Sequence, residues 1–199
     1  MKINIASKNN GRLQMNGFTL IEMIGVLAVI AILAALLIPK VTSAISDARV
    51  NATVGSYQTI QSAATGHYSK YNAFNLTTNG VTLTAAQLAN FDTGALLPEG
   101  FLDQPFSAKA GNGAVVEVVT GGGNASAGYK LDGQNVATAN NSYTVECVIS
   151  NVVAQDAFDI AARVDGTLAN TNVVGSSIFG GKVVWTSGTG LMYLYVAGR

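Results

Sequence analysis

The chain has 199 residues, of which 49% are hydrophobic and only 11% are charged. A charged fraction this low is unusual for a free soluble protein. The formal net charge of zero gives no basic field for binding nucleic acid, and the single cysteine excludes an intrachain disulfide.

The first 17 residues form a polar, basic segment that contains Lys2, Lys8 and Arg12. Basic residues before an apolar segment favour retention in the cytoplasm, so we expect the C-terminal part of the chain to cross the membrane. The rest of the chain has eight basic and eleven acidic residues and is therefore mildly acidic.

An apolar run follows from Phe18 to Ile38, and Glu22 is its only charged residue. As a helix, this run would be roughly 31 Å long, which is enough to cross the hydrocarbon core of a bilayer. A carboxylate in that environment is costly unless it has a partner, so Glu22 is a candidate functional residue. The run contains no Lys, Arg or His that would serve as the partner.

A cut between Gly17 and Phe18 would supply a partner, because the new α-amine would lie at helical reach of Glu22. The residues from Gly17 to Glu22 resemble the processing site of type IV prepilins and of the related pseudopilins of type II secretion. In both, a small residue precedes the cut, Phe follows it, and Glu is the fifth mature residue. The alternative is an ordinary signal anchor with a chance glutamate.

This resemblance implies cleavage after Gly17 by a prepilin peptidase and N-methylation of Phe18 by the same processing machinery. It implies that Glu22 guides assembly by meeting the amine of a neighbouring subunit. It also implies a single-pass protein of the bacterial inner membrane with a periplasmic C-terminus. An inner-membrane assembly platform would then draw the subunits into a helical homopolymer, either a surface pilus or a periplasmic pseudopilus.

Two further features of the apolar segment bear on assembly. Small residues would let helix backbones approach closely, although ordinary alanine usage explains them equally well; they are Gly25, Ala28, Ala31, Ala34 and Ala35. Pro39 follows the run directly and, because it has no N–H, should kink or loosen the helix there. The resemblance links such loosening to filament packing.

The helical pattern continues beyond Pro39, because apolar residues recur at steps of three and four along two lines. The first line is Val41, Ile45, Ala48 and Ala52, and the second is Val50, Val54, Tyr57, Ile60, Ala64, Tyr68 and Tyr71. We predict one long helix from Phe18 to about Lys70. Its first half, residues 18–38, would face lipid or other subunits, and its second half, residues 39–70, would pack on the chain's own head.

Residues 71–199 are expected to form this head. Loops should dominate residues 72–113, with a short helix at 85–90. Alternating and β-branched residues predict strands at 114–119, 129–131, 142–150, 182–186 and 191–196, the last two forming a hairpin. An amphipathic helix at 153–164 would be capped by Asn151 and ended by Asp165-Gly166. The fold class is therefore α+β and pilin-like, with a long helix packed on an antiparallel sheet.

No residue pattern indicates a catalytic centre, a cofactor or a metal site, and we predict that the chain is not an enzyme. His67 has no second His or Cys nearby in sequence, so a solvated or packed side chain is expected. Cys147 lies in an alternating strand and should behave as a small hydrophobic residue. Three acids between positions 156 and 165 are compatible with calcium, but Arg163 can pair with Asp159, so a solvated helix face is preferred.

Three functions fit this sequence. The first is a structural subunit of a type IV pilus or a related filament, whether major or minor. The second is a type II secretion pseudopilin that forms a periplasmic piston, which electron microscopy of sheared cell-surface material would distinguish from the first. The third is an uncleaved anchor for a periplasmic binding or enzyme domain, which a loss of mass on co-expression with a prepilin peptidase would exclude.

Overall fold

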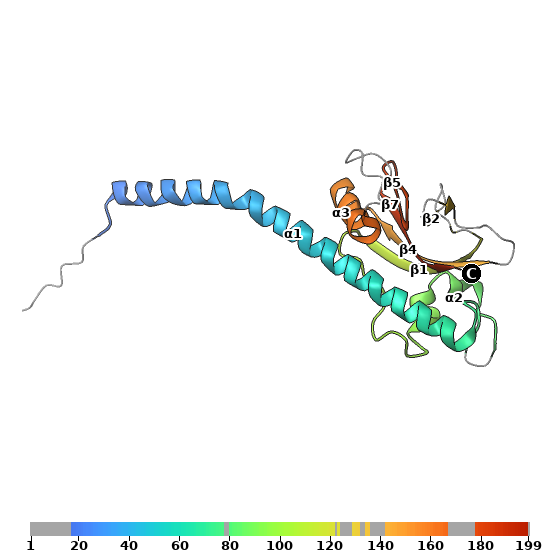
Figure 1. The fold of residues 1–199 in the computed structure, drawn as a ribbon. Helices are drawn as coiled ribbons and strands as arrows, with labels where there is room; N and C mark the ends of the chain where they lie inside the picture. The colour runs from blue at the N-terminus through green and yellow to red at the C-terminus, as the bar shows by residue number, and fades with distance from the viewer. Residues whose placement is uncertain are drawn as a thin grey trace, which may run out of the picture. The chain divides into compact units, whose positions relative to one another are not determined.

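The computed structural model describes residues 17–77, 80–121, 123, 129–131, 134–135, 142–166 and 178–198. Its first element is the long helix α1 (Leu20–Tyr71), which is coloured blue to green in Figure 1. The chain divides into two compact units, Met1–Thr42 and Ser43–Arg199. Helix α1 contributes to both of them.

In the first unit, the described residues consist of the N-terminal part of α1 and the three residues before it. Every residue from Gly17 to Thr42 is exposed. The helix runs through Pro39 without interruption. In the turn that follows, the Thr42 hydroxyl donates to the carbonyls of Pro39 (2.8 Å) and Ile38 (3.3 Å). The proline ring removes one backbone donor, but the helical conformation continues past it.

The second unit is built on a five-stranded antiparallel sheet with the strand order β1-β4-β7-β6-β5. Its strands are β1 (Gly113–Thr120), β4 (Tyr143–Ser150), β5 (Ile178–Gly180), β6 (Val183–Thr186) and β7 (Leu191–Gly198). A separate antiparallel pair consists of β2 (Lys130–Leu131) and β3 (Gln134–Asn135). Every predicted strand is present, and β6 and β7 form the predicted hairpin. β3 and β5 were not predicted, because two or three residues are too few to show alternation.

The second half of α1 packs one face on this sheet. Its buried residues follow the three-and-four spacing of a single helix face and include Val50, Thr53, Tyr57, Ile60, Ala64 and His67. The apolar ones share one core with Val145, Cys147 and Ile149 of β4. Each large side chain buried there contributes about 1.5–3 kcal/mol. The predicted packing of a long helix on an antiparallel sheet is confirmed, and the other apolar line, which begins at Val41, is exposed.

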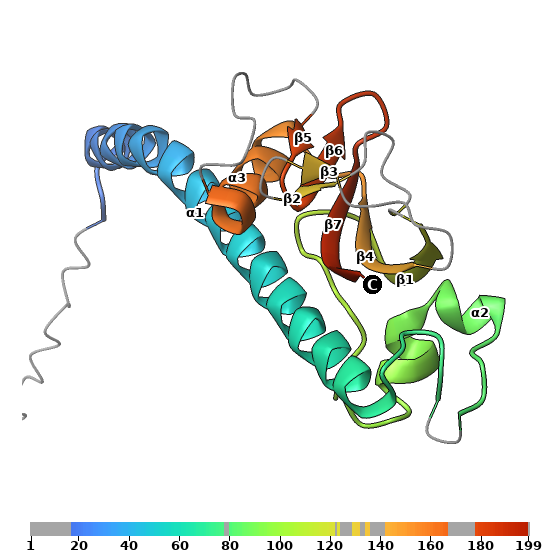
Figure 2. The same cartoon turned by 45° about the vertical axis from the view of Figure 1, so that its right-hand side comes forward.

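Helix α3 (Ala154–Asp165) lies beside α1 in the second unit (Figure 2). Its apolar face is buried in the core through Ala157, Ile160 and Ala161. Two polar contacts join the helices: Ser46 Oγ donates to Asp156 Oδ1 (2.5 Å), and Arg163 Nη2 pairs with Asp47 Oδ1 (3.1 Å). Asp156 is therefore buried against α1 and does not belong to a solvated helix face.

Two local predictions for α3 were wrong. The residue at the N-cap position is Val153, which makes no capping hydrogen bond, whereas Asn151 adopts a left-handed conformation with φ of 56°. Asparagine tolerates this conformation better than most residues. Asp159 does not pair with Arg163 but accepts hydrogen bonds from Gln155 Nε2 at 3.2 and 3.3 Å. The predicted end of the helix at Gly166 is confirmed.

The connection between α1 and β1 is anchored by two buried side chains. It contains the short helix α2 (Ala85–Leu88) and the π-helical turn η1 (Asp92–Leu96). The Asp92 carboxylate accepts from the backbone N–H of Phe106 (3.0 Å), and the Thr53 hydroxyl accepts from those of Lys109 and Ala110 (3.1 Å each). These contacts give partners to backbone donors in a segment without regular hydrogen bonding.

Candidate functional site

The candidate site is the segment from Gly17 to Glu22, where α1 begins. Gly17, Phe18 and Thr19 precede the helix, and Phe18 is 85% exposed. A Cβ atom placed on Gly17 would meet no other described atom within 4 Å. The peptide bond between Gly17 and Phe18 therefore lies in uncovered, non-helical backbone, which is the condition a peptidase needs to reach it.

Glu22 and Thr19 form a reciprocal capping arrangement around the first turn of α1. Glu22 Oε2 accepts from the backbone N–H of Thr19 (2.8 Å) and from the Thr19 hydroxyl (2.7 Å). In return, the Glu22 backbone N–H donates to Thr19 Oγ1 (3.3 Å). This is a capping box, in which residues three apart satisfy each other's free donors. The carboxylate also lies at the positive end of the helix dipole, which favours its negative charge.

Glu22 therefore has a hydrogen-bonding partner within its own chain. The signal for it, a Thr-x-x-Glu spacing, is present in the sequence but was not among the predictions. A carboxylate oxygen that accepts two hydrogen bonds costs less in an apolar medium than one without partners. The predicted contact of Glu22 with the amine of Phe18 in another copy stays a prediction.

Gly25 and Pro39, the other predicted assembly residues, are both exposed on α1. A Cβ atom added at Gly25 would meet no described atom of the chain within 4 Å. The fold of a single chain does not require glycine at this position. Any requirement for a small residue there would have to come from a neighbouring molecule, and the assembly roles of both residues stay predictions.

The surface that surrounds Glu22 is apolar. The large apolar side chains between Leu20 and Ile38 are 48–77% exposed. Among the described residues, α1 is the one helix that is long and apolar enough to cross a membrane. An exposed apolar surface of this extent marks a contact with lipid or with other protein.

The alternative sites do not form a reactive centre. Cys147 is fully buried, and burial together with the nearby carboxylates of Asp92 and Glu146 raises the pKa of its thiol well above the usual value. The thiolate, which is the reactive form, is therefore disfavoured. His67 is also fully buried, and this confirms the packed alternative of its prediction.

The three acids of the calcium alternative have separate partners and do not converge. Asp165 accepts from the backbone N–H groups of Lys182 (2.7 Å) and Val183 (2.9 Å), whereas Asp156 and Asp159 face the partners described above. In the described ranges, no three side chains of His, Cys, Asp or Glu are grouped so that they could hold a metal ion.

A further buried acid lies on the outer face of β4. Glu146 is fully buried, and Tyr129, also buried, donates its hydroxyl to Glu146 Oε2 (2.6 Å). A Cβ atom on Gly123, whose φ is 96°, would lie only 2.7 Å from that same oxygen. Tyr129 and Gly123 therefore lie against this face of the sheet, which the alternation of β4 did not reveal.

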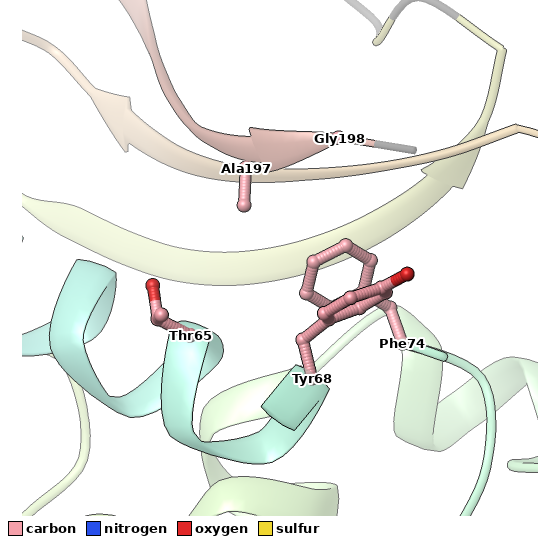
Figure 3. A pocket seen from close by; sticks show the side chains of 5 residues that line it. All are labelled: Thr65, Tyr68, Phe74, Ala197 and Gly198. Atoms are coloured by element: carbon pink, nitrogen blue, oxygen red, sulfur yellow. The ribbon is translucent and has the colours of Figure 1, made fainter. Parts of the chain in front are cut away.

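A small open pocket lies where the end of α1 meets the end of β7 (Figure 3). Its volume is about 210 Å³, and it is lined by Thr65, Tyr68, Phe74, Ala197 and Gly198. None of these five lining residues is charged. The two hydroxyl groups among mostly apolar atoms offer no acid, base or nucleophile pair, so the pocket has no catalytic arrangement.

Comparisons with known proteins support the candidate site at Gly17–Glu22. The family model described as the prokaryotic N-terminal methylation motif matches residues 12–38, which confirms the resemblance of this segment. Among solved structures, the chain is similar to the major type IV pilin PilA1 from Clostridium difficile, with a TM-score of 0.40 and 16% identity. That likeness covers 77% of this chain and 98% of the other. No curated protein sequence matches the chain.

Proposed function

Because residues 12–38 carry the prokaryotic N-terminal methylation motif, we propose that the chain is a structural subunit of a type IV pilus or a closely related filament. It is made as a membrane-held precursor and cut between Gly17 and Phe18. Phe18 is then N-methylated, and an inner-membrane assembly platform adds the subunit to the polymer.

The mechanism follows from the two environments of α1. Before assembly, lipid surrounds the apolar side chains between Leu20 and Ile38, and in the filament the same helices of other copies surround them. Because both surroundings exclude water, the hydrophobic effect does not favour one over the other, and close van der Waals packing of the apolar side chains provides most of the cohesion. Glu22 sets the register between neighbouring helices, since a carboxylate in an apolar environment favours the alignment in which it meets a positive amine.

The capping box between Thr19 and Glu22 gives the carboxylate hydrogen-bonding partners in the membrane, before it meets the amine of another copy. In the membrane, Glu22 Oε2 keeps the two hydrogen bonds from Thr19 (2.8 and 2.7 Å). In the filament, the amine of a neighbouring Phe18 adds a charged partner. In that contact both the donor and the acceptor are charged, whereas Thr19 is neutral, and this favours the assembled register.

The observation that carries this proposal is the position of Glu22. It is the single charge of the exposed apolar run from Phe18 to Ile38, it lies in the first turn of α1, and the accessible Gly17–Phe18 bond precedes it. A soluble domain has no use for this combination, whereas a polymer held together by its apolar helices needs one specific polar contact to set the register.

The experiment is electron microscopy of sheared cell-surface material from a host that provides a prepilin peptidase and an assembly platform. We expect fibres that contain this chain. Gly17→Leu, which places a large side chain before the cut, should leave precursor in the membrane and abolish the fibres. Gly188→Ala, at an exposed turn with no described atom within 4 Å of the added Cβ, is the matched control and should form fibres normally.

The compartment in which the polymer is found separates the two kinds of filament. Fibres in the sheared fraction support a surface pilus. Processed chain that forms polymers only in the periplasm supports a secretion pseudopilus. Unprocessed chain that stays monomeric in the membrane, in a host with both activities, would contradict the proposal.

A further inference from the structure

His67 lies in an aromatic enclosure at the C-terminal end of α1, within the second unit. Its side chain is fully buried, and it is the single histidine of the whole sequence. The rings of Tyr71, Phe91 and Phe101 approach it edge-on, with centroid distances of 4.8, 5.1 and 5.7 Å. An imidazole in such surroundings is removed from water on several sides.

The polar atoms of this enclosure are poorly satisfied. His67 Nε2 lies 3.6 Å from Glu99 Oε2, a distance too long for a hydrogen bond. Within the described residues, both ring nitrogens of His67 and Oε2 of Glu99 are buried and make no hydrogen bond of normal geometry, although the backbone carbonyls of Ala73 and Leu76 act on the ring. Unsatisfied buried groups are costly, and three together in one place call for a physical explanation.

The cover over His67 is a short turn at the surface, residues 97–101, which we call the flap turn. Backbone N–H groups of Glu99 and Phe101 donate to the carbonyls of Ala95 (3.1 Å) and Leu96 (2.8 Å). Leu97, Pro98 and Gly100 are exposed, whereas the side chains of Glu99, which is only 10% exposed, and of Phe101 lie against His67 of α1. Opening of this turn would break the contacts that Glu99 and Phe101 make with α1.

Four charged or polar groups act on the protonation of His67. The Glu99 carboxylate and the backbone carbonyls of Ala73 and Leu76 favour the imidazolium, and the Lys70 ammonium disfavours it. Burial opposes the imidazolium more strongly than any of these groups, so the pKa of His67 is lowered from its ordinary value of 6.5. With the flap turn closed, His67 is neutral at neutral pH.

The direction of the pH effect follows from this lowered pKa. If the flap turn opens, water reaches His67 and its pKa returns toward the ordinary value. Between the two pKa values, the open form binds a proton that the closed form does not. The closed form is therefore fully stable above about pH 6.5 and loses stability as the pH falls below it.

We propose that His67 and Glu99 form a proton-controlled latch: the flap turn covers a neutral His67, and uptake of a proton by this side chain releases the turn from α1. Release exposes Phe101 and Glu99, both on the surface of the second unit. The exposure of these two side chains at the end of α1 would then depend on the pH of the medium. The latch is independent of the proposed filament function, because it involves neither the first unit nor another copy.

The test uses the full chain in detergent micelles. Because the chain has one histidine, its ring resonances in an NMR titration report on His67 alone. Amide hydrogen exchange of residues 97–101, corrected for the intrinsic pH dependence, is measured at about pH 7.5 and about pH 5.5. We expect His67 to titrate below 6.5, and protection of the flap turn to fall as it titrates.

Two variants give shifts of opposite sign. Glu99→Gln removes a charge that favours the imidazolium, so the midpoint of the His67 titration should move to lower pH. Lys70→Gln removes a charge that disfavours it, so the midpoint should move to higher pH. His67→Gln should make protection of the flap turn independent of pH over this range.

Several results would overturn the latch. They are protection that is constant or rises in acid, an unchanged pH dependence in His67→Gln, and midpoints in the two charge variants that stay in place or move in the same direction. If His67→Gln does not fold, the titration of the unmodified chain and of the two charge variants still decides the matter.

Discussion

At the scale of single residues, our proposal gives the carboxylate of Glu22 two roles, helix capping and a charge for assembly. It accepts two hydrogen bonds from Thr19 at the start of α1, and it carries the only negative charge of an apolar surface. Glutamine can perform the first task, because its side-chain oxygen also accepts hydrogen bonds, but it has no charge for the second. This difference allows the two tasks to be separated.

We predict that Glu22→Ala and Glu22→Gln both leave a processed, membrane-held subunit that assembles poorly, since both remove the charge that sets the register. The measurement is the yield of sheared filaments relative to processed chain in the membrane. Thr19→Val, which keeps the charge and removes the hydroxyl, weakens helix capping by about 1 kcal/mol and should reduce the yield less. Normal filament yield from Glu22→Gln would show that capping, and not charge, is the task of Glu22.

Thr53 is the second residue for which we make a prediction, and it was missed in the sequence because a threonine on an apolar helix face gives no signal. Thr53→Val leaves the N–H groups of Lys109 and Ala110 without their shared acceptor. Each such loss costs about 1–3 kcal/mol. Thermal unfolding of the full chain should show this destabilisation, whereas Thr59→Val, at an exposed position of the same helix, should change stability by less than about 0.5 kcal/mol. Equal effects of the two substitutions would contradict the anchoring role of Thr53.

Cys147 provides a direct probe of the core, because the chain has no other thiol. Its side chain is fully buried and its thiol pKa is raised. We expect a thiol-reactive probe at neutral pH to label the folded chain only at the rate of its unfolding, and to label it rapidly in denaturant. Fast labelling of the folded chain would mean that β4 does not lie in a closed core.

At the scale of elements, the structure was predictable where the signal is local. The face of α1 that packs on the sheet follows from apolar residues repeating at three and four positions, and the β6–β7 hairpin follows from two strand patterns around a glycine-rich turn. The outer face of β4 was not predictable, because Glu146 is covered by Tyr129 and approached by Gly123, which have no pattern of their own in the sequence.

The same reasoning explains the errors at α3. Arg163 and Asp159 have the spacing of a helical ion pair, but the actual partner, Asp47, is 116 positions away along the chain. A surface pair of this kind is worth only about 0.2–1 kcal/mol, so helix packing and not charge decides which partner is chosen. The candidate site at Gly17–Glu22 was recognisable because it is a contiguous motif.

Substitution of two glycines by alanine should change the stability of the second unit in opposite directions. Gly55 is an exposed residue of α1, and an added Cβ would meet nothing within 4 Å. Gly55→Ala should therefore stabilise the second unit by about 1 kcal/mol. At Gly111 the added Cβ would lie 2.5 Å from the carbonyl oxygen of Ser150, so Gly111→Ala should destabilise it by about 1–3 kcal/mol. Thermal unfolding measures both, and a gain in stability from Gly111→Ala would contradict the packing described here.

At the scale of the whole molecule, our proposal gives the two units different roles: the first anchors and assembles the chain, and the second forms the folded head. The first unit has an exposed apolar helix surface and the processing motif, and these act only in the membrane or in a polymer. The second unit folds around its own core and contains the sheet, α3 and the latch. Substitutions in the core of the second unit should therefore change stability, whereas substitutions at Gly17, Phe18 or Glu22 should change processing or assembly and leave that core intact.

The identity of the N-terminal residue in the native protein tests the central proposal most directly. Mass spectrometry of the chain from its own membrane or filament should find Phe18 at the N-terminus, with the added mass of one methyl group on its amine. Native chain that retains residues 1–17, isolated from cells with an active prepilin peptidase, would contradict the account, because Glu22 would then have no terminal amine to meet.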